Sequence, residues 1–280
     1  SLKSAPQAAA ARPGQNPPSL LLGAAQFLLT DHCDHPLARF YPALTGQPAP
    51  ADDPYPTLRD FILNHRDQII AIVATRLVQT NEPARSSYLY PALLAAQRLG
   101  GGQPLALIEI GPSAGLTRVP DRYAYDYGTG ALHGDPTSPM VFSCALRGDS
   151  TPPLAGTLSV RWRIGVDVHP LDLNDPADRQ WLRALIWPDH PDRAQRSTRP
   201  PPGPCRTSTR ATPQKPCPTS WPKLRTTQQR SCSNTAVLAH FTQQARTGFA
   251  QRLLELSTWR PITWVQGKPR TDQQPRRTLR

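Results

Sequence analysis

A run of apolar residues that ends in a glycine turn most constrains the fold of this chain. Residues 105–116 read Leu-Ala-Leu-Ile-Glu-Ile-Gly-Pro-Ser-Ala-Gly-Leu. A nearly continuous apolar run is typical of a strand buried on both faces of a parallel sheet. Glycines at 111 and 115 let the backbone turn sharply and let a ligand approach closely. The pattern favours a turn that holds a phosphate or nucleotide, although a plain tight turn between a strand and a helix uses glycine in the same way.

The same turn fits a second chemistry. Gly111-Pro-Ser-Ala-Gly115 has the spacing of the nucleophile elbow of serine hydrolases, which places a serine, here Ser113, at the tip of the turn. Pro112 before the serine and Glu109 in the strand suit a nucleotide turn better. Asp167 and His240 are formally available as acid and base, but their order along the chain is not a convincing triad.

The order of the predicted elements is that of an α/β chain. Apolar spacing predicts helices over 8–30, 56–78, 86–99, 113–119, 175–186 and 242–257. Strands are predicted over 105–110, 122–128, 140–146, 159–168 and 261–265, and residues 236–241 are predicted to be a buried strand or the start of a helix. We expect a Rossmann-like, mostly parallel sheet with a helical N-terminal cap.

This order divides the chain into five parts. We predict a helical cap over 1–102, the first part of the Rossmann-like domain with a tyrosine-rich insertion over 103–192, an aberrant, disordered, proline-rich basic stretch over 193–234, the last part of the domain over 235–265, and a basic tail over 266–280.

The net charge of +12 comes from two of these parts. Residues 193–234 contain nine basic and no acidic residues, and 266–280 contribute a further +4, so the remainder is near neutral. A charge gathered in such segments argues against a nucleic-acid groove built into the fold. No apolar run is long enough to span a membrane, the N-terminus lacks the pattern of a secretory signal, and cysteine spacing predicts neither a disulfide framework nor a metal site. We expect a cytoplasmic protein.

Residues 196–233 lack any helical or strand periodicity. They fit a disordered basic linker, but a frameshift explains them better. When G/C-rich codons are chosen for this stretch and read two bases later, they encode GDAPETLPDLLAETAHHPAAVVF, which contains an amphipathic helix and a buried strand. This peptide runs directly into Asn234-Thr235-Ala236-Val237-Leu238. The sequence therefore indicates a pair of compensating frameshifts.

A second strand supports a cofactor at the glycine turn. The segment 160–168 ends in Asp167, and an acid at the end of the second strand can accept both ribose hydroxyls of an adenosyl cofactor. With the Gly-Asp of the out-of-frame peptide, the order is similar to the nucleotide half of class I S-adenosylmethionine-dependent methyltransferases. Glu109, Gly111, Ser113, Gly115 and Asp167 are the predicted cofactor-binding residues. The interval from the turn to Asp167 is about 50 residues, against about 20 in a compact unit, so an insertion must lie between them.

Other polar residues are candidates for substrate binding and catalysis. Gln79, Asn81, Glu82 and Arg85 follow a predicted helix and are expected to point into a substrate cleft above Gly111, although Glu82 and Arg85 also fit a surface pair. In the tyrosine-rich segment we predict Tyr125 and Asp126 as catalytic residues, one acting as general base, and Arg122 as a substrate contact. Tyrosines that alternate along a strand are more often half-buried packing residues. His32 and His35, beside Asp31 and Asp34, fit a polar turn better than a metal site.

Several motifs resemble the bacterial family known as domain of unknown function 2332. They are Val78-Gln79-Thr80-Asn81-Glu82 with Arg85, Asp121 to Gly128, His35-Pro-Leu, Gly134-Asp-Pro, Asp167 to Leu173 and Trp181 to Pro188. The resemblance extends from about Asn16 to Trp264, apart from 196–233, and implies a bacterial cytoplasmic protein with a Rossmann-like core. The chain departs from its relatives at Thr117 and His169, where they usually carry asparagine, and at Arg118-Val119, where they carry an apolar pair.

The expected function is binding of S-adenosylmethionine and methyl transfer to an unidentified small acceptor. The alternatives are a serine hydrolase that uses Ser113 and a binding module or pseudo-enzyme without catalysis.

Overall fold

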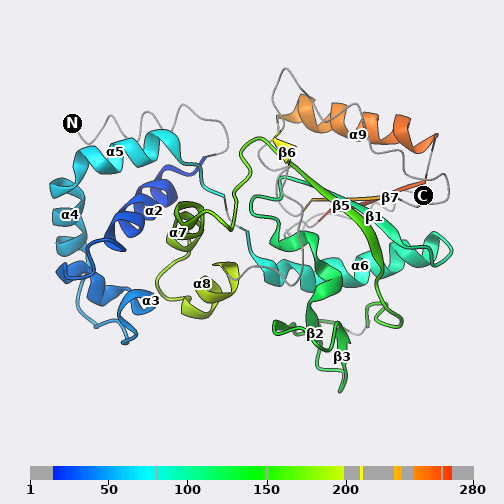
Figure 1. The fold of residues 1–280 in the computed structure, drawn as a ribbon, viewed down its shortest axis with the longest axis horizontal. Coiled ribbons are helices and arrows are strands. Elements are labelled where there is room, and N and C mark those ends of the chain that lie inside the picture. The colour runs from blue at the N-terminus through cyan, green and yellow to red at the C-terminus, as the bar shows by residue number, and fades with distance from the viewer. Residues whose placement is uncertain are drawn as a thin grey trace.

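The computed structural model describes residues 15–79, 81–148, 151–198, 209–210, 230–234, 242–259 and 261–266. This part of the chain combines helices with a parallel sheet, so the protein is α/β. Figure 1 shows two lobes, one made of helices and one built around the sheet. The elements predicted over 8–14 and 236–241, most of the basic stretch and frameshift segment, and residues 267–280 of the tail lie outside the described residues.

The helical lobe starts with α2 (Pro17–Leu29), η1 (Pro36–Phe40), α3 (Pro42–Thr45), α4 (Tyr55–Asn64) and α5 (Arg66–Thr75). The Asn16 side chain caps α2 by accepting the Ser19 N–H, and proline occupies the first helical position. The single helix predicted over 56–78 is two helices, because His65 leaves the helical conformation at φ −109° and ψ 23°.

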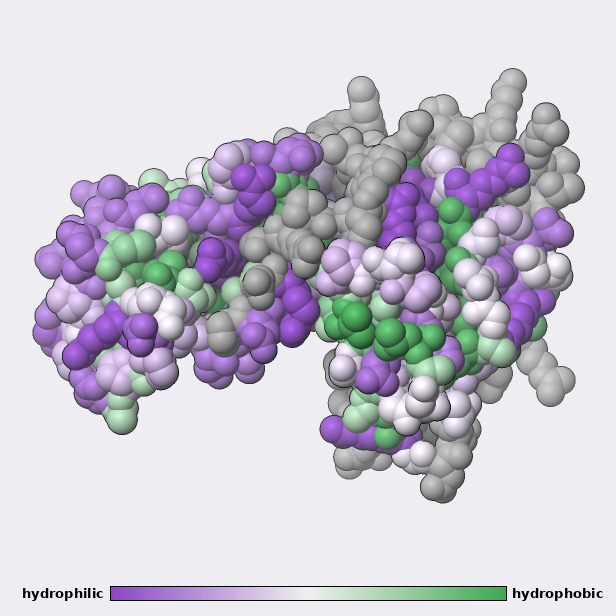
Figure 2. All heavy atoms as spheres, turned by 60° about the horizontal axis from the view of Figure 1, so that its bottom comes forward, coloured by the Kyte–Doolittle hydropathy of each residue, from purple (hydrophilic) through white to green (hydrophobic). Residues whose placement is uncertain are grey.

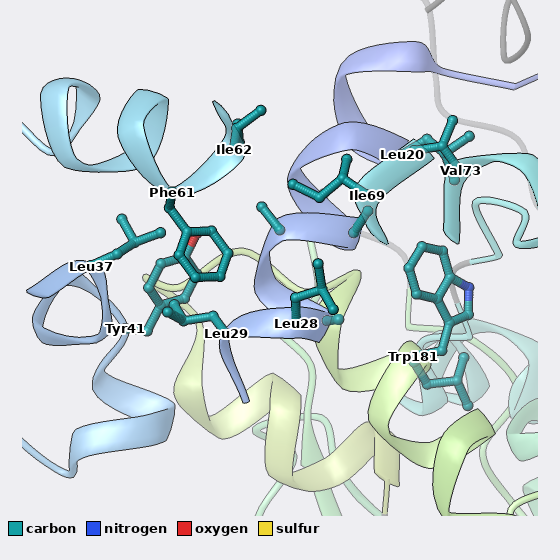
Figure 3. Packing of buried hydrophobic residues seen from close by; sticks show 14 of the residues in the cluster. Leu20, Leu28, Leu29, Leu37, Tyr41, Phe61, Ile62, Ile69, Val73 and Trp181 are labelled. Atoms are coloured by element: carbon teal, nitrogen blue, oxygen red, sulfur yellow. The ribbon is translucent and has the colours of Figure 1, made fainter. Parts of the chain in front are cut away.

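Two later helices complete this lobe, α7 (Pro176–Ala184) and α8 (Pro191–Thr198). Trp181 of α7 is fully buried among apolar residues of the lobe, including Leu28 and Val73 (Figure 3), and its indole N–H donates to the Leu77 carbonyl over 2.9 Å. The prediction of disorder from residue 193 is wrong for the start of that stretch. Ala194 is only 3% exposed, so α8 is held by a buried side chain.

The other lobe is built on a five-stranded sheet. Its strands are β1 (Leu105–Ile110), β5 (Val160–Asp167), β6 (Thr209–Arg210), β7 (Arg230–Asn234) and β8 (Ile262–Gln266). Their spatial order is β6-β5-β1-β7-β8, and every neighbouring pair is parallel. Figure 1 shows α6 (Ser86–Leu99) and α9 (Gln243–Ser257) on opposite sides of this sheet. The predicted parallel sheet is therefore confirmed, with β1 at its centre.

The tyrosine-rich insertion forms a separate small sheet of β2 (Ala124–Asp126), β3 (Leu132–Gly134) and β4 (Val141–Ser143). Strand β2 pairs antiparallel with β3 and parallel with β4. The insertion supplies Tyr123, Tyr125 and Tyr127 to a second apolar cluster, which also contains residues of α6 and β1.

The segment between β1 and the small sheet is not the helix predicted over 113–119. It forms a tight turn and two short 3-10 helices, η3 (Leu116–Arg118) and η4 (Pro120–Arg122). Gly115 has φ +78°, a left-handed conformation that an α-helix cannot contain.

Among the described residues, no helix is both long and apolar enough to cross a membrane. Figure 2 shows a largely hydrophilic surface on the helical lobe, interrupted by a small group of apolar side chains.

Candidate functional site

The turn after β1 has an unusual backbone. Gly111, Ser113 and Gly115 have φ values of +69°, +52° and +78°. Among the described residues, Ser113 is the non-glycine residue with a positive φ. Such a conformation costs on the order of 1–3 kcal/mol, persists only where its surroundings enforce it, and is concentrated at functional sites. Contacts from two neighbouring segments hold Ser113 in place.

Asp167 holds the turn from the neighbouring strand. Parallel pairing sets Ile110 beside Val166, so the ends of β1 and β5 meet at one edge of the sheet. The Ser113 N–H donates to Asp167 Oδ2 over 2.7 Å, and the His169 N–H donates to Asp167 Oδ1 over 2.9 Å. Asp167 is 7% exposed. The structure thus brings together the glycine turn and the acid that the sequence singled out.

Asn81 holds the turn from the helical side. Its Nδ2 donates to the Pro112 carbonyl over 2.9 Å, and its Oδ1 accepts the Leu116 N–H over 2.8 Å. Nearby, Gln79 Nε2 donates to the His169 carbonyl over 2.6 Å. These two predicted substrate residues therefore lie at the turn, where the hydrogen bonds described above join their side chains to the backbone of the site.

Glu109 is buried at the end of β1. It is 1% exposed, and its Oε1 accepts the Thr117 hydroxyl. Burial raises the pKa of Glu109 to about 7, since desolvation of the carboxylate outweighs the Thr117 hydrogen bond and the positive charges of Arg118 and Arg85. The carboxyl is therefore half ionised near neutral pH.

Several buried polar atoms around the turn have no hydrogen-bond partner among the described residues. They are Glu109 Oε2, Ser113 Oγ, Gln79 Oε1 and His169 Nδ1. Buried polar groups in proteins are nearly always hydrogen-bonded, so each exception calls for an explanation. The three oxygen atoms can each accept a hydrogen bond wherever their protons lie. The fourth atom, His169 Nδ1, accepts or donates according to the tautomer of the imidazole. The site is therefore rich in hydrogen-bond acceptors.

Arg118 is a residue of the site that the sequence analysis did not predict. It is 2% exposed, and its guanidinium packs so closely on Gly115 that a Cβ at that position would overlap it. The positive φ of Gly115 and the position of the Arg118 guanidinium together explain why the turn requires glycine at residue 115. In the sequence, an arginine before Val-Pro resembles a surface residue, and its departure from the family pattern was the one available signal.

The other predicted substrate residues lie around this centre in different settings. Glu82 caps η2 (Pro83–Arg85) by accepting the Ala84 N–H over 3.2 Å, and its carboxylate also pairs with Arg193 of α8. Arg85 is near enough to Glu109 to lower its pKa. Arg122 ends η4 and is half-buried.

The predicted catalytic pair lies in the small sheet. Tyr125 is fully buried, donates its hydroxyl to the Pro120 carbonyl over 2.6 Å, and contacts the ring of Tyr90. Burial raises the pKa of Tyr125 well above 10, so its hydroxyl stays protonated. Asp126 Oδ1 accepts the Gly128 N–H in a turn. These contacts match the packing alternative, and a catalytic role for Tyr125 or Asp126 remains a prediction.

The histidine-rich turn has a local role. His35 caps η1 by accepting the Leu37 N–H on Nδ1 over 3.1 Å, and His32 lies against the ring of His65. In the described ranges, no group of three or more His, Cys, Asp or Glu side chains is arranged to hold a metal ion.

Comparison with known proteins identifies the family. A family model described as "Uncharacterized protein conserved in bacteria (DUF2332)" matches residues 2–199. No curated protein and no solved structure matches the chain. The match covers well over half of the chain, including the glycine turn, Asn81 and Asp167. The chain therefore belongs to the bacterial DUF2332 family.

Proposed function

We propose that this protein binds S-adenosylmethionine at the turn after β1 and transfers its methyl group to a small-molecule acceptor in the bacterial cytoplasm. The sheet order supports a Rossmann-like core for this purpose. Counted along the chain, the strands lie in the order third, second, first, fourth, fifth, which is that of doubly wound nucleotide-binding sheets. Ligands of such sheets bind outside the carboxyl end of the first strand, where Gly111–Gly115 lies.

The hydrogen bond between Ser113 and Asp167 carries this proposal. It joins the strained glycine turn to an acid at the end of the adjacent strand, the two parts that hold the amino-acid end and the ribose of an adenosyl cofactor. Each oxygen of Asp167 accepts one backbone N–H and retains a further lone pair for a ribose hydroxyl.

The unpartnered atoms at the turn fit this ligand. Glu109 Oε2 and Ser113 Oγ are buried acceptors without partners among the described residues, and the ammonium group of S-adenosylmethionine supplies donors. When bound, the cofactor supplies an electrophilic methyl group on its sulfonium. The protein's own part is to orient the two reactants and to exclude water.

Titration calorimetry with S-adenosylmethionine tests the proposal. The full chain should bind it saturably, and Asp167→Asn should weaken binding at least tenfold. Asp135→Asn, a change in an exposed turn outside the site, should leave the affinity unchanged. Circular dichroism and thermal unfolding of each variant would separate lost affinity from lost structure. Absence of binding to the wild-type chain and to an intact-frame relative would refute the proposal.

A serine hydrolase is the second candidate, favoured by the backbone of Ser113. A positive φ at a serine between two glycines is what the nucleophile elbow requires. However, the Ser113 hydroxyl has no hydrogen bond to a base in the described part of the chain. Labelling of Ser113 by a fluorophosphonate, lost in Ser113→Ala, would favour this function over cofactor binding. With neither labelling nor cofactor binding, a binding module or pseudo-enzyme remains.

We also propose that residues 196–233 are the product of two compensating frameshifts. The family match ends at residue 199, near the start of this stretch. Strand β7, Arg-Ser-Cys-Ser-Asn, lies between β1 and β8 in the sheet, a position normally occupied by apolar residues. The out-of-frame peptide ends in Val-Val-Phe directly before Asn234, so it supplies an apolar strand at this same position.

Resequencing the gene decides this point. The frameshift is excluded if the codons of 196–233 are confirmed and the same residues occur in active relatives. If it is correct, a chain carrying the out-of-frame peptide should unfold at a higher temperature than the present chain and bind S-adenosylmethionine more tightly.

A further inference from the structure

The helical lobe contains a cavity that is separate from the turn after β1. Its volume is about 440 Å³, within the range of small-molecule sites. None of the residues of the Gly111–Gly115 turn lines it. Helix α2, η1, the segment 49–58 and residues 184–193 form its walls. The side chains that line it include those of Ser19, Leu22, Gln26, Phe40, Tyr41 and Trp187.

The lining is mostly apolar. Aliphatic side chains from α2, α4 and the segment after α7 surround the cavity, together with the rings of Phe40, Tyr41 and Trp187. Trp187 remains about half exposed, at 49%, and marks a side that is open to solvent. An apolar cavity of this size favours a ligand with an aliphatic or aromatic body, since burial of apolar surface provides most of the binding free energy.

Tyr41 provides a polar group in this lining. The residue is 6% exposed, and its hydroxyl is not among the fully buried polar atoms of the described residues that lack a partner. Burial raises the pKa of Tyr41 to about 12, so at neutral pH the hydroxyl is protonated and can donate. A ligand acceptor in the cavity can therefore take the place of water as the partner of this hydroxyl.

The charged residues of the lining are already neutralised. Asp52 pairs with Arg39, and Arg193 pairs with Glu82. The amide of Gln26, oriented to satisfy its surroundings, donates to the carbonyls of Ala184 and Ile186. A charged ligand would lose its hydration without gaining a free counter-charge here.

We propose that this cavity binds an uncharged apolar small molecule that carries one hydrogen-bond acceptor, a carbonyl or ether oxygen, directed at the Tyr41 hydroxyl. The cavity shares no lining residue with the Gly111–Gly115 turn.

Prodan, an uncharged naphthalene ketone whose fluorescence reports both polarity and hydrogen bonding, is a suitable probe. It should bind the full-length chain saturably, with emission shifted to shorter wavelength than in water. Ser19→Phe, which places a ring in the cavity, should abolish binding. Ser143→Phe, the same substitution on an exposed strand outside the cavity, should leave it unchanged.

Tyr41→Phe tests the hydrogen bond. It should weaken prodan binding about fivefold, the effect of one neutral hydrogen bond, and should leave unchanged the binding of 2-ethylnaphthalene, which has no acceptor. Equal prodan affinity in the wild-type chain and Ser19→Phe, with Ser19→Phe folded by circular dichroism, would overturn the site. Tighter binding of the anionic 1-anilinonaphthalene-8-sulfonate than of prodan would overturn the assignment of an uncharged ligand.

Discussion

The backbone N–H of Ser113 donates to Asp167 across 54 residues of sequence, and this bond joins the two halves of the candidate site. It holds a serine at φ +52° that a free turn would not adopt. The same carboxylate accepts the His169 N–H, so one side chain fixes the backbone that follows β1 and the backbone that follows β5.

Asp167→Ala should therefore destabilise the fold as well as the site. It removes two charge-assisted hydrogen bonds and leaves two largely buried N–H groups without acceptors, so we expect the free energy of unfolding to fall by about 2–4 kcal/mol. Urea denaturation followed by circular dichroism measures this change. Asp135→Ala is the control, since Asp135 accepts similar turn hydrogen bonds at the surface. Equal losses in the two variants would contradict a special role for Asp167.

Glu109→Gln should change how stability depends on pH. The pKa of Glu109 is raised from 4.5 to about 7 on folding, so its contribution to stability is fully present below about pH 4.5 and is lost as the pH rises through 7. Glutamine cannot ionise. Relative to the wild type, Glu109→Gln should become more stable by about 3 kcal/mol between pH 4.5 and pH 8.

Urea unfolding at pH 5 and pH 8 measures that difference. Glu255→Gln, a change on the exposed face of α9, provides the control, and its stability should differ from that of the wild type by nearly the same amount at both pH values. A Glu109→Gln effect of equal size at pH 5 and pH 8 would show that the carboxyl does not titrate in this range.

Gly115→Ala should be destabilising for two separable reasons. Its φ of +78° strains any residue with a Cβ, and that Cβ would overlap the Arg118 guanidinium. We expect a loss of about 2 kcal/mol in unfolding free energy. In a double-mutant cycle, Arg118→Ala should recover the steric part of the loss. Purely additive effects would mean that the two residues do not compete for space.

Arg163→Met should be among the more damaging single changes in the sheet lobe. Its guanidinium donates to both oxygens of Asp121, over 2.9 and 2.8 Å, and both side chains are largely buried. Loss of one partner of a buried pair costs about 3–5 kcal/mol. Arg59→Met breaks an exposed pair with Asp60 and should cost less than about 1 kcal/mol. Thermal unfolding of both variants makes the comparison, and similar melting temperatures would argue against it.

Periodicity in the sequence predicts the regular elements well where side-chain burial decides them. The apolar run 105–110 is β1 within a residue, and α6 occupies 86–99 as predicted. The expected helix over 113–119 is wrong because Gly115 and the clamp by Asn81 impose a turn. Asn81 is separated from Pro112 by 31 residues, so no local pattern could have revealed that contact.

The acidic residues and glycines of the candidate site could be predicted from the sequence, because they lie at or just after the ends of predicted strands. Arg118 was not, because an arginine buried against a glycine has no local signature and depends on the fold around it. Tyr125 shows the opposite difficulty. A polar aromatic in an alternating strand fits both a catalytic group and a packed ring, and only its buried surroundings distinguish them.

The late arrival of α7 and α8 in the helical lobe has a consequence for synthesis of the protein. Gln180 donates to the Phe27 carbonyl across 153 residues, and Trp181 donates to Leu77 across 104. A nascent chain that ends at residue 102 lacks the tryptophan that fills the centre of this lobe. Helices α2 to α5 must therefore wait, partly exposed, until about residue 198 has emerged from the ribosome. During that interval the apolar face of α2 is a surface for chaperones to protect.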